Sequence, residues 1–159
     1  MRPQSHIEPA RDGGHETGLS LYERVANLLG LRSHVRSDVD LIERLEKGLP
    51  AAAVHALRSR AGLTDEETYA LIAPRRTLQR RETLRQPLSP EEADRAVRIA
   101  RIIARAQHVF DARPDYASEW LRTPHPAIGG RTAMQALASE SGALAVEDIL
   151  IGIEYGMFG

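Results

Sequence analysis

An isolated run of arginines between residues 75 and 85 is the part of this sequence with the clearest chemical purpose. It holds five arginines, with Glu82 as its one acidic residue. On a helical wheel with Leu78 facing inward, Arg76 and Arg80 point directly away from the core. Arginine and glutamine side chains reach base edges in the major groove of DNA, while flanking arginines and threonines bind phosphates. The run therefore predicts a recognition helix whose DNA-binding residues are Arg75, Arg76, Thr77, Gln79, Arg80, Arg81 and Thr83.

A solvated basic face on a surface helix is the alternative interpretation of the same arginines. Two features favour DNA contact instead. The net charge of the chain is −1, so the positive charge is local to this run. A short helix, opened by a capping box at Thr64 and Glu67, and a tight turn at Ala73 and Pro74 precede it. This order of elements is that of a helix-turn-helix.

No set of residues has the spacing of a catalytic or metal site. None of the six histidines stands at a spacing typical of a zinc-binding helix. The Gly129-Gly130 pair lacks the lysine and the preceding strand of a phosphate-binding loop, and there is no nucleophile elbow. We therefore predict that the chain is not an enzyme and needs no metal or cofactor. A small enzyme with an unrecognised site is kept as an alternative.

Composition favours a helical protein of the cytoplasm. Hydrophobic residues make up 42% of the 159 positions and aromatic residues only 4%, so the core must be built from Leu, Ile, Val and Ala. The sequence contains no cysteine, which fits a reducing compartment. No apolar run approaches the roughly 18 residues of a membrane span, and the first residues lead into no signal-peptide-like stretch. We expect no membrane association.

Signals for helix starts and ends follow one another along the chain and predict an all-α fold. Capping boxes, in which a serine or threonine and a glutamate satisfy each other's backbone donors, begin at Ser20, Thr64 and Ser89. Thr132 caps a further helix. Glycines that end or separate helices lie at Gly30, Gly48, Gly62 and Gly142. A sheet is not expected, because no segment alternates apolar and polar residues as a strand does.

The helix that follows Ser89 is long and runs to about Phe110. Its apolar stripe is wide, which predicts burial on more than one side, between two domains or two protomers. The expected organisation is a flexible tail over residues 1–18 and a helix-turn-helix domain over 19–88. A connecting or dimerisation helix follows over 89–110, and a small helical partner-binding domain over 111–159.

Three features of the C-terminal half point toward a protein partner. Trp120, the only tryptophan, precedes a loop at 123–131 that holds two prolines and two glycines. An apolar segment with Tyr155, Met157 and Phe158 follows the last expected helix. Each feature also has a structural interpretation: Trp120 as a core anchor under the loop, and the apolar segment packed back on the body.

In order and spacing, these stretches resemble the Xre/MbcA/ParS antitoxins, which pair with RES-domain toxins. The resemblance covers roughly residues 20–159. Its first half is carried by Gly48-Leu49-Pro50, Arg75-Arg76-Thr77-Leu78-Gln79-Arg80-Arg81 and Leu88-Ser89-Pro90-Glu91-Glu92. Its second half is carried by Val109-Phe110, Trp120-Leu121-Arg122-Thr123-Pro124, Ile128-Gly129-Gly130-Arg131-Thr132, Val146-Glu147-Asp148-Ile149-Leu150 and Ile153-Glu154-Tyr155-Gly156-Met157-Phe158.

The resemblance implies an Xre-like DNA-binding domain followed by a toxin-binding domain. It also implies a cognate RES toxin that acts on NAD, either destroying it or using it to ADP-ribosylate a target. The antitoxin would cover the NAD cleft of the toxin, form homodimers and larger complexes with toxin, and repress its own operon at operator DNA. The implied toxin-binding residues are Trp120, Arg122, Pro124, Gly129, Gly130, Arg131, Glu154, Tyr155, Met157 and Phe158.

The sequence departs from the family pattern at two positions. Ala133 follows Thr132 where the family usually has proline, and Gly152 stands where an arginine is common shortly before the final Ile-Glu pair. If that arginine normally reaches the NAD-phosphate site of the toxin, this chain must block the site differently. A plain dimeric helix-turn-helix regulator without a toxin partner is the alternative function.

Overall fold

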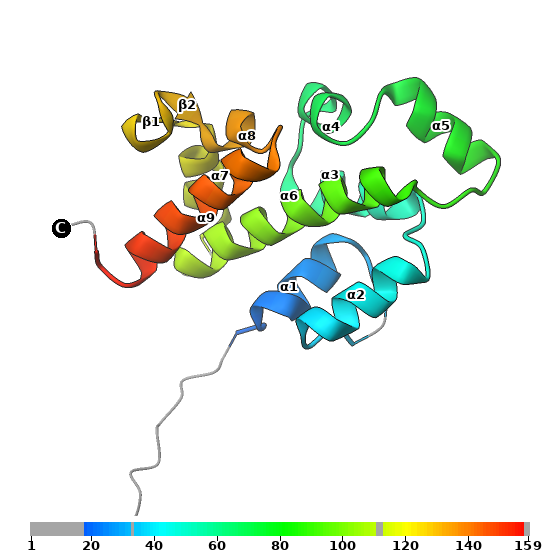
Figure 1. Ribbon diagram of the computed structural model, residues 1–159, viewed down its shortest axis with the longest axis horizontal. Helices are drawn as coiled ribbons and strands as arrows, with labels where there is room; N and C mark the ends of the chain where they lie inside the picture. The colour runs from blue at the N-terminus through cyan, green and yellow to red at the C-terminus, as the bar shows by residue number, and fades with distance from the viewer. Residues whose placement is uncertain (1–17, 33, 111–112, 158–159) are drawn as a thin grey trace, which may run out of the picture.

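Helices form most of the protein in the computed structural model, which describes residues 18–32, 34–110 and 113–157. The predicted all-α fold is confirmed, with one small hairpin added (Figure 1). The helices are α1 (Leu21–Leu28), α2 (Asp38–Glu46), α3 (Ala52–Ala61), α4 (Asp65–Leu71), α5 (Arg75–Thr83), α6 (Pro90–Val109), α7 (Pro114–Arg122), α8 (Ala133–Ala136) and α9 (Glu140–Glu154). All but the last residue of the tail predicted over 1–18, and Phe158, lie outside the described residues.

Capping boxes start the helices where the sequence predicts them. At α6, the Ser89 hydroxyl accepts a hydrogen bond from the Glu92 amide at 3.2 Å, and the Glu92 carboxylate accepts one from the Ser89 amide at 2.9 Å. The same reciprocal pattern begins α1 and α4. Gly62 ends α3 in the left-handed conformation, with φ of 66°, which glycine adopts without a steric penalty. Side-chain hydrogen bonds from the capping residue thus set most of the helix starts.

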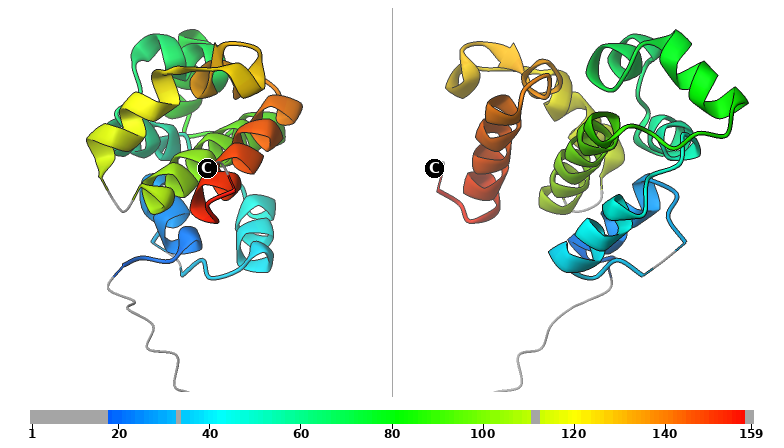
Figure 2. Two further views of the ribbon diagram at one scale, coloured as in Figure 1. Left: turned by 90° about the vertical axis from the view of Figure 1, so that its left-hand side faces the viewer. Right: turned by 45° about the vertical axis from the view of Figure 1, so that its right-hand side comes forward.

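Helix α6 is the centre of the molecule, and elements from both halves of the chain pack around it. α1 and α3 lie against it from the N-terminal half, and α7 and α9 from the C-terminal half (Figures 1 and 2). The predicted burial on more than one side is therefore confirmed within a single chain. The buried apolar residues of α6 are Ala93, Ala96, Val97, Ile99, Ala100, Ile102, Ile103, Ala104 and Ala106.

A two-stranded hairpin follows α7, and it corrects the expectation that the fold has no sheet. β1 (Pro124–His125) pairs antiparallel with β2 (Arg131–Thr132), around a short 3₁₀ helix, η1 (Pro126–Ile128). Gly129 and Gly130 close the loop with φ of 68° and 74°, a region that L side chains rarely adopt. Two-residue strands are too short to produce an alternating pattern, so the sequence shows only the turn.

Gly142 lies inside α9, although its residue type predicts a separation between the last two helices. Helix α9 is capped by Ser139, whose hydroxyl accepts a hydrogen bond from the Gly142 amide at 3.0 Å. A Cβ atom at position 142 would lie 2.0 Å from the carbonyl oxygen of Ala136. The glycine therefore marks a close approach of α8 to the first turn of α9 rather than a helix end.

The α4–α5 pair and the hairpin lie toward opposite ends of the long axis of the molecule (Figure 1). The C-terminal end of α9 lies toward the same end as the hairpin, which the turned view also shows (Figure 2). Among the described residues, no helix combines the length and the hydropathy that crossing a bilayer requires. The fold thus separates the predicted DNA-binding helix from the predicted partner-binding segments.

Replacing Gly142 with alanine should destabilise the protein by about 1–3 kcal/mol, because the new methyl group would have to displace the Ala136 carbonyl. The measurement is the free energy of unfolding in urea. Gly18→Ala is the control, since a Cβ atom there would meet Arg24 at an ordinary 3.5 Å. Equal stability of the two variants would show that α8 and α9 are not in this close contact.

Candidate DNA-binding and partner-binding surfaces

Helix α5 exposes the basic face that the sequence predicts. Leu78 is half-buried and packs against the core, so the helix has the rotation assumed on the helical wheel. The ion pairs found among the described residues do not involve Arg75, Arg76 or Arg80. The side chains on the exposed face are Arg75, Arg76, Gln79, Arg80 and Thr83, while Thr77 is half-buried.

The α4–α5 pair is attached to the rest of the protein by apolar and polar contacts. Every residue of α5 is at least partly exposed, and Thr68 is the buried residue of α4. Ile72 and Ala73, between the two helices, are buried in the core, and Arg95 of α6 donates a hydrogen bond to the carbonyl oxygen of Ile72 at 3.0 Å. A hydrogen bond from the Leu88 amide to the Leu49 carbonyl, at 2.8 Å, ties the segment after α5 to the start of α3.

Arg81 has a partner inside the protein. Its Nε and Nη2 atoms donate to the two carboxylate oxygens of Glu92, at 2.6 and 3.1 Å, in a bidentate pair. The Arg81 side chain is 19% exposed and that of Glu92 is 9% exposed. Sequence reasoning grouped Arg81 with the DNA-binding arginines, whereas the structure places it between α5 and the start of α6.

The electrostatics of Glu92 follow from this pair. Burial of the carboxylate by itself would raise the pKa of Glu92. Hydrogen bonds from the Arg81 guanidinium and the Ser89 amide outweigh that effect and hold the pKa below its usual range. The hydrogen bonds from Arg81 to Glu92, together with the negative charge of that carboxylate, raise the pKa of Arg81. Glu92 therefore stays ionised in the folded state, where it both caps α6 and orients α5.

Two groups of predicted partner-binding residues are exposed. Pro124, Gly129, Gly130 and Arg131 lie on the surface of the hairpin. After α9, the exposed fractions are 73% for Tyr155 and 67% for Met157. These two apolar side chains do not pack back onto the body, which was the structural alternative for this segment.

The other three predicted partner-binding residues that the structure describes make contacts within the chain. The Trp120 ring lies 5.6 Å from Phe110 and 4.4 Å from His125, between ring centroids, as a core anchor under the loop would. Glu154 binds Arg105 and His108 of α6, both at 3.2 Å. Arg122 forms an ion pair with Glu67 of α4. Phe158 lies outside the described residues.

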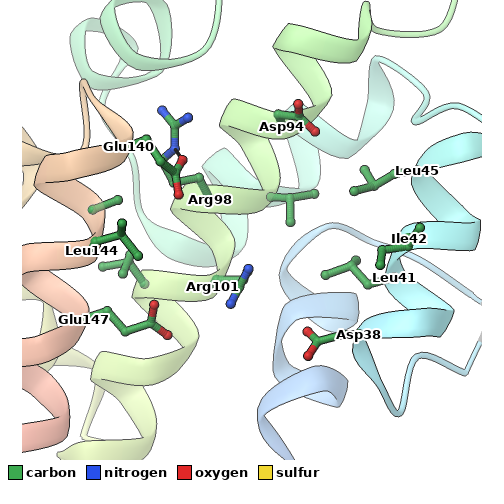
Figure 3. A pocket seen from close by; sticks show the side chains of 13 residues that line it. Asp38, Leu41, Ile42, Leu45, Asp94, Arg98, Arg101, Glu140, Leu144 and Glu147 are labelled. Carbon is green, nitrogen blue, oxygen red and sulfur yellow. Dashed lines mark hydrogen bonds and ion pairs between the residues drawn. The ribbon is translucent and has the colours of Figure 1, made fainter.

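A groove of about 470 Å³ between α2, α6 and α9 was not predicted (Figure 3). Exposed Ile42 of α2 and Leu144 of α9 line it, each with 54% of its surface accessible. Arg98 and Glu140 form a 2.7 Å ion pair between α6 and α9. Among the described residues no group of acidic or histidine side chains could hold a metal ion. The groove mixes apolar and charged residues, as protein-binding surfaces do.

Two family models cover most of the described chain. Residues 40–101 match the antitoxin Xre-like helix-turn-helix domain, and residues 105–156 match the antitoxin Xre/MbcA/ParS C-terminal toxin-binding domain. An antitoxin Xre from Pseudomonas putida is 34% identical over 94% of this chain and 90% of its own length. The chain belongs to the Xre/MbcA/ParS family of antitoxins.

Two further relatives support the assignment of this chain to the antitoxin family. An antitoxin Xre from Yersinia enterocolitica is 29% identical over 74% of this chain and 80% of its own length. A Prs ADP-ribosylating antitoxin from a Sphingobium species is 28% identical over 77% of this chain and 82% of its own length. The relatives are antitoxins, a non-enzymatic family, in agreement with the prediction that the chain is not an enzyme. The two family matches meet on α6.

Replacing Glu92 with glutamine should lower the stability of the antitoxin at neutral pH by about 1–3 kcal/mol, because the half-buried Arg81 guanidinium loses its negatively charged partner. A carboxyl whose folded pKa is lowered contributes stability above its unfolded pKa and loses it as the pH falls through the folded value. The wild type should therefore lose more stability than Glu92→Gln between about pH 5 and pH 3. Urea unfolding at several pH values measures this.

Glu91→Gln is the control for that experiment, since it removes one carboxylate from an exposed position on the same helical turn. Glutamine at position 92 still accepts the capping hydrogen bond, so the α6 start is retained. Parallel pH profiles for the wild type and Glu92→Gln would contradict the role assigned to the Arg81–Glu92 pair.

Proposed function

We propose that this antitoxin neutralises a cognate RES-domain, NAD-consuming toxin by covering its active site, and that it represses its own operon by binding operator DNA. The observation that carries the proposal is the presence of two separate exposed surfaces at opposite ends of one fold (Figure 1). One is the basic face of α5. The other comprises the hairpin and the Tyr155–Met157 segment, which lie within or beside the matched toxin-binding domain.

DNA binding is supported by the chemistry of α5 within the matched helix-turn-helix domain. Arg76, Gln79 and Arg80 lie on the exposed face, where they can enter a major groove. Arg75 and Thr83 lie at the two ends of that face and suit phosphates. Thr77 is half-buried beside them and is kept as a phosphate contact. Arg81 takes a different role in the proposal, orienting α5 through Glu92.

Toxin occlusion is supported by the exposure of apolar side chains that have no packing role in the free protein. Tyr155 and Met157 have the size and hydrophobicity of residues that dominate protein interfaces. Exposed Arg131 on the hairpin adds a positive charge to the proposed surface. Gly152 is buried in α9, so the position of the common family arginine contributes packing in this chain. We therefore assign the blockage to Tyr155, Met157 and the hairpin.

The proposed substrate of the toxin is NAD, and the antitoxin itself binds no cofactor. The resemblance to antitoxins of RES-domain toxins supports this assignment. One relative carries ADP-ribosylation in its name, and ADP-ribosylation consumes NAD. The proposed place of action is the cytoplasm, where both NAD and operator DNA are found. We further propose a homodimer, for which the groove offers exposed Ile42 and Leu144 among charged residues.

Arg76→Ala and Arg80→Ala should each weaken binding to the DNA upstream of the antitoxin's own coding sequence by about five- to 150-fold, as expected for arginines that contact bases. Loss of a phosphate contact would instead lower the salt dependence of binding by about one unit of the logarithmic slope. Fluorescence anisotropy at several salt concentrations distinguishes the two. Arg131→Ala, at the opposite end of the molecule, is the control and should bind as the wild type does. Wild-type affinity of both α5 variants would refute DNA contact by this helix.

The double variant Tyr155→Ala/Met157→Ala should bind the co-encoded toxin at least about tenfold more weakly, because two exposed apolar anchors are removed. The measurements are titration calorimetry and rescue of growth on co-expression with toxin. Leu84→Ala is the matched control, since this side chain is 58% exposed and follows α5 at the other end. Full rescue by the double variant would show that the toxin is blocked by another surface.

Light scattering on the same preparations gives the mass of the antitoxin and of its complex. A dimer alone, and a larger assembly with toxin, are the expected results. A monomer that also forms a one-to-one complex would contradict the proposed assembly. The calorimetry and growth rescue would still test the proposed occlusion of the toxin.

A further inference from the structure

We infer that Arg122 is a positioning residue that links the toxin-binding domain to α4, the first helix of the helix-turn-helix. The contact of Arg122 with α4 is observed in the structure. Its role in coupling toxin binding to DNA binding rests on the proposed function. Nothing in the motif that contains Arg122 distinguishes this role from the toxin contact implied by the family resemblance. The structure shows which atoms the side chain binds.

Arg122 is the last residue of α7, and its guanidinium binds α4 bidentately. Its Nε donates to Oε1 of Glu67 at 2.9 Å, and its Nη2 donates to Oε2 of the same carboxylate at 2.8 Å. Nη2 also donates to the carbonyl oxygen of Gly62, in the turn before α4, at 3.3 Å. Nη1 is held by Ser118, through its hydroxyl at 2.6 Å and its carbonyl at 3.2 Å. The side chain is therefore fixed on both helices.

Glu67 also caps α4, so its contact with Arg122 bears on the start of that helix. Its Oε2 accepts a hydrogen bond from the Thr64 amide at 3.0 Å, so the same carboxylate closes the capping box of α4. Its side chain is 19% exposed and that of Arg122 is 31% exposed, so solvent screens the pair only in part. A movement of Arg122 is thereby transmitted to the first turn of α4.

The other contacts of the α4–α5 pair show what Arg122 adds to its position. The pair is held to α6 by Arg81–Glu92 and by Arg95 on Ile72, whose side chain is buried in the core. It also contacts α3 through Arg58–Asp65 and His55–Glu82. Arg122 adds a contact that comes from the matched toxin-binding domain. The pose of the recognition helix thus depends on a residue that lies outside the matched DNA-binding domain.

The partner-binding hairpin begins two residues after Arg122. Thr123 follows the helix, and β1 starts at Pro124. The ring of His125 in β1 lies against Trp120, and its Nε2 is 2.9 Å from the Trp120 carbonyl oxygen. A toxin bound at the hairpin would therefore act on the C-terminal turn of α7, and through Arg122 on α4. Such coupling is reciprocal, so DNA bound at α5 must also affect the end of α7.

Hydrogen–deuterium exchange on the full chain tests the positioning role without any ligand. Arg122→Gln and Glu67→Gln should accelerate amide exchange in α4 by about fivefold or more, with exchange in α1 and α6 unchanged, because only a local tie is lost. Glutamine at position 67 still caps α4, so the second variant isolates the ion pair from the cap. Arg98→Gln is the matched control, since it breaks the Arg98–Glu140 pair between α6 and α9, in which no residue of α4 takes part. Wild-type exchange in α4 for both pair variants would overturn the inference.

The fluorescence of Trp120 tests the coupling, since this residue is the only tryptophan and lies in α7. Saturation with labelled upstream DNA, verified by anisotropy, should change Trp120 emission in the wild type. Arg122→Gln should lose that change and bind the DNA about fivefold more weakly, at the lower end of common coupling strengths. Unchanged emission in a wild type that binds DNA would overturn the coupling. A wild type that binds no DNA would refute the proposed operator binding instead, and the exchange data would still decide the positioning role.

Discussion

The packing of both halves of the chain onto α6 is the interaction on which the rest of the structure depends. Five of the nine buried apolar residues of α6 are alanines, and such small side chains allow neighbouring helices to approach closely on several sides. Each of the buried valine and isoleucine side chains contributes about 1.5–3 kcal/mol relative to exposure, so removal of α6 would take a large part of the core from both halves. The antitoxin is therefore one body in which two functional domains share a helix.

Around this apolar centre, ion pairs between arginines and carboxylates fix the orientation of neighbouring helices. Glu92 and Glu67 each close a capping box, and each also binds an arginine from a distant element. Arg105 similarly joins α6 to Glu154 at the end of α9. Charge-assisted hydrogen bonds of this kind are directional, whereas apolar burial is not. They can fix the pose of a helix such as α5 that contributes little to the core.

Much of the fold could be predicted because the signals that specify it are local. The helix starts at Ser20, Thr64 and Ser89 can be predicted from the glutamate three positions further on. The rotation of α5 can be predicted from the apolar position of Leu78. The contacts of Arg81, Arg122 and Glu154 could not be predicted, because their partners lie 11, 55 and 49 positions away in the sequence. Arginine type and spacing do not reveal whether a side chain binds DNA, a toxin or a carboxylate of its own chain. The prediction that Gly142 separates two helices was wrong for a different reason, since its residue type does not show the close approach of the Ala136 carbonyl across the turn between α8 and α9.

The central claim is that the antitoxin acts by covering two different partners with two separate surfaces of one fold. Side-chain footprinting of the full chain, bound to upstream DNA, to the co-encoded toxin, and to both, tests it most directly. The account predicts that DNA protects α5, that toxin protects the hairpin and the Tyr155–Met157 segment, and that both footprints persist in the ternary complex. Overlapping footprints, or toxin protection confined to the α2–α6–α9 groove, would contradict it.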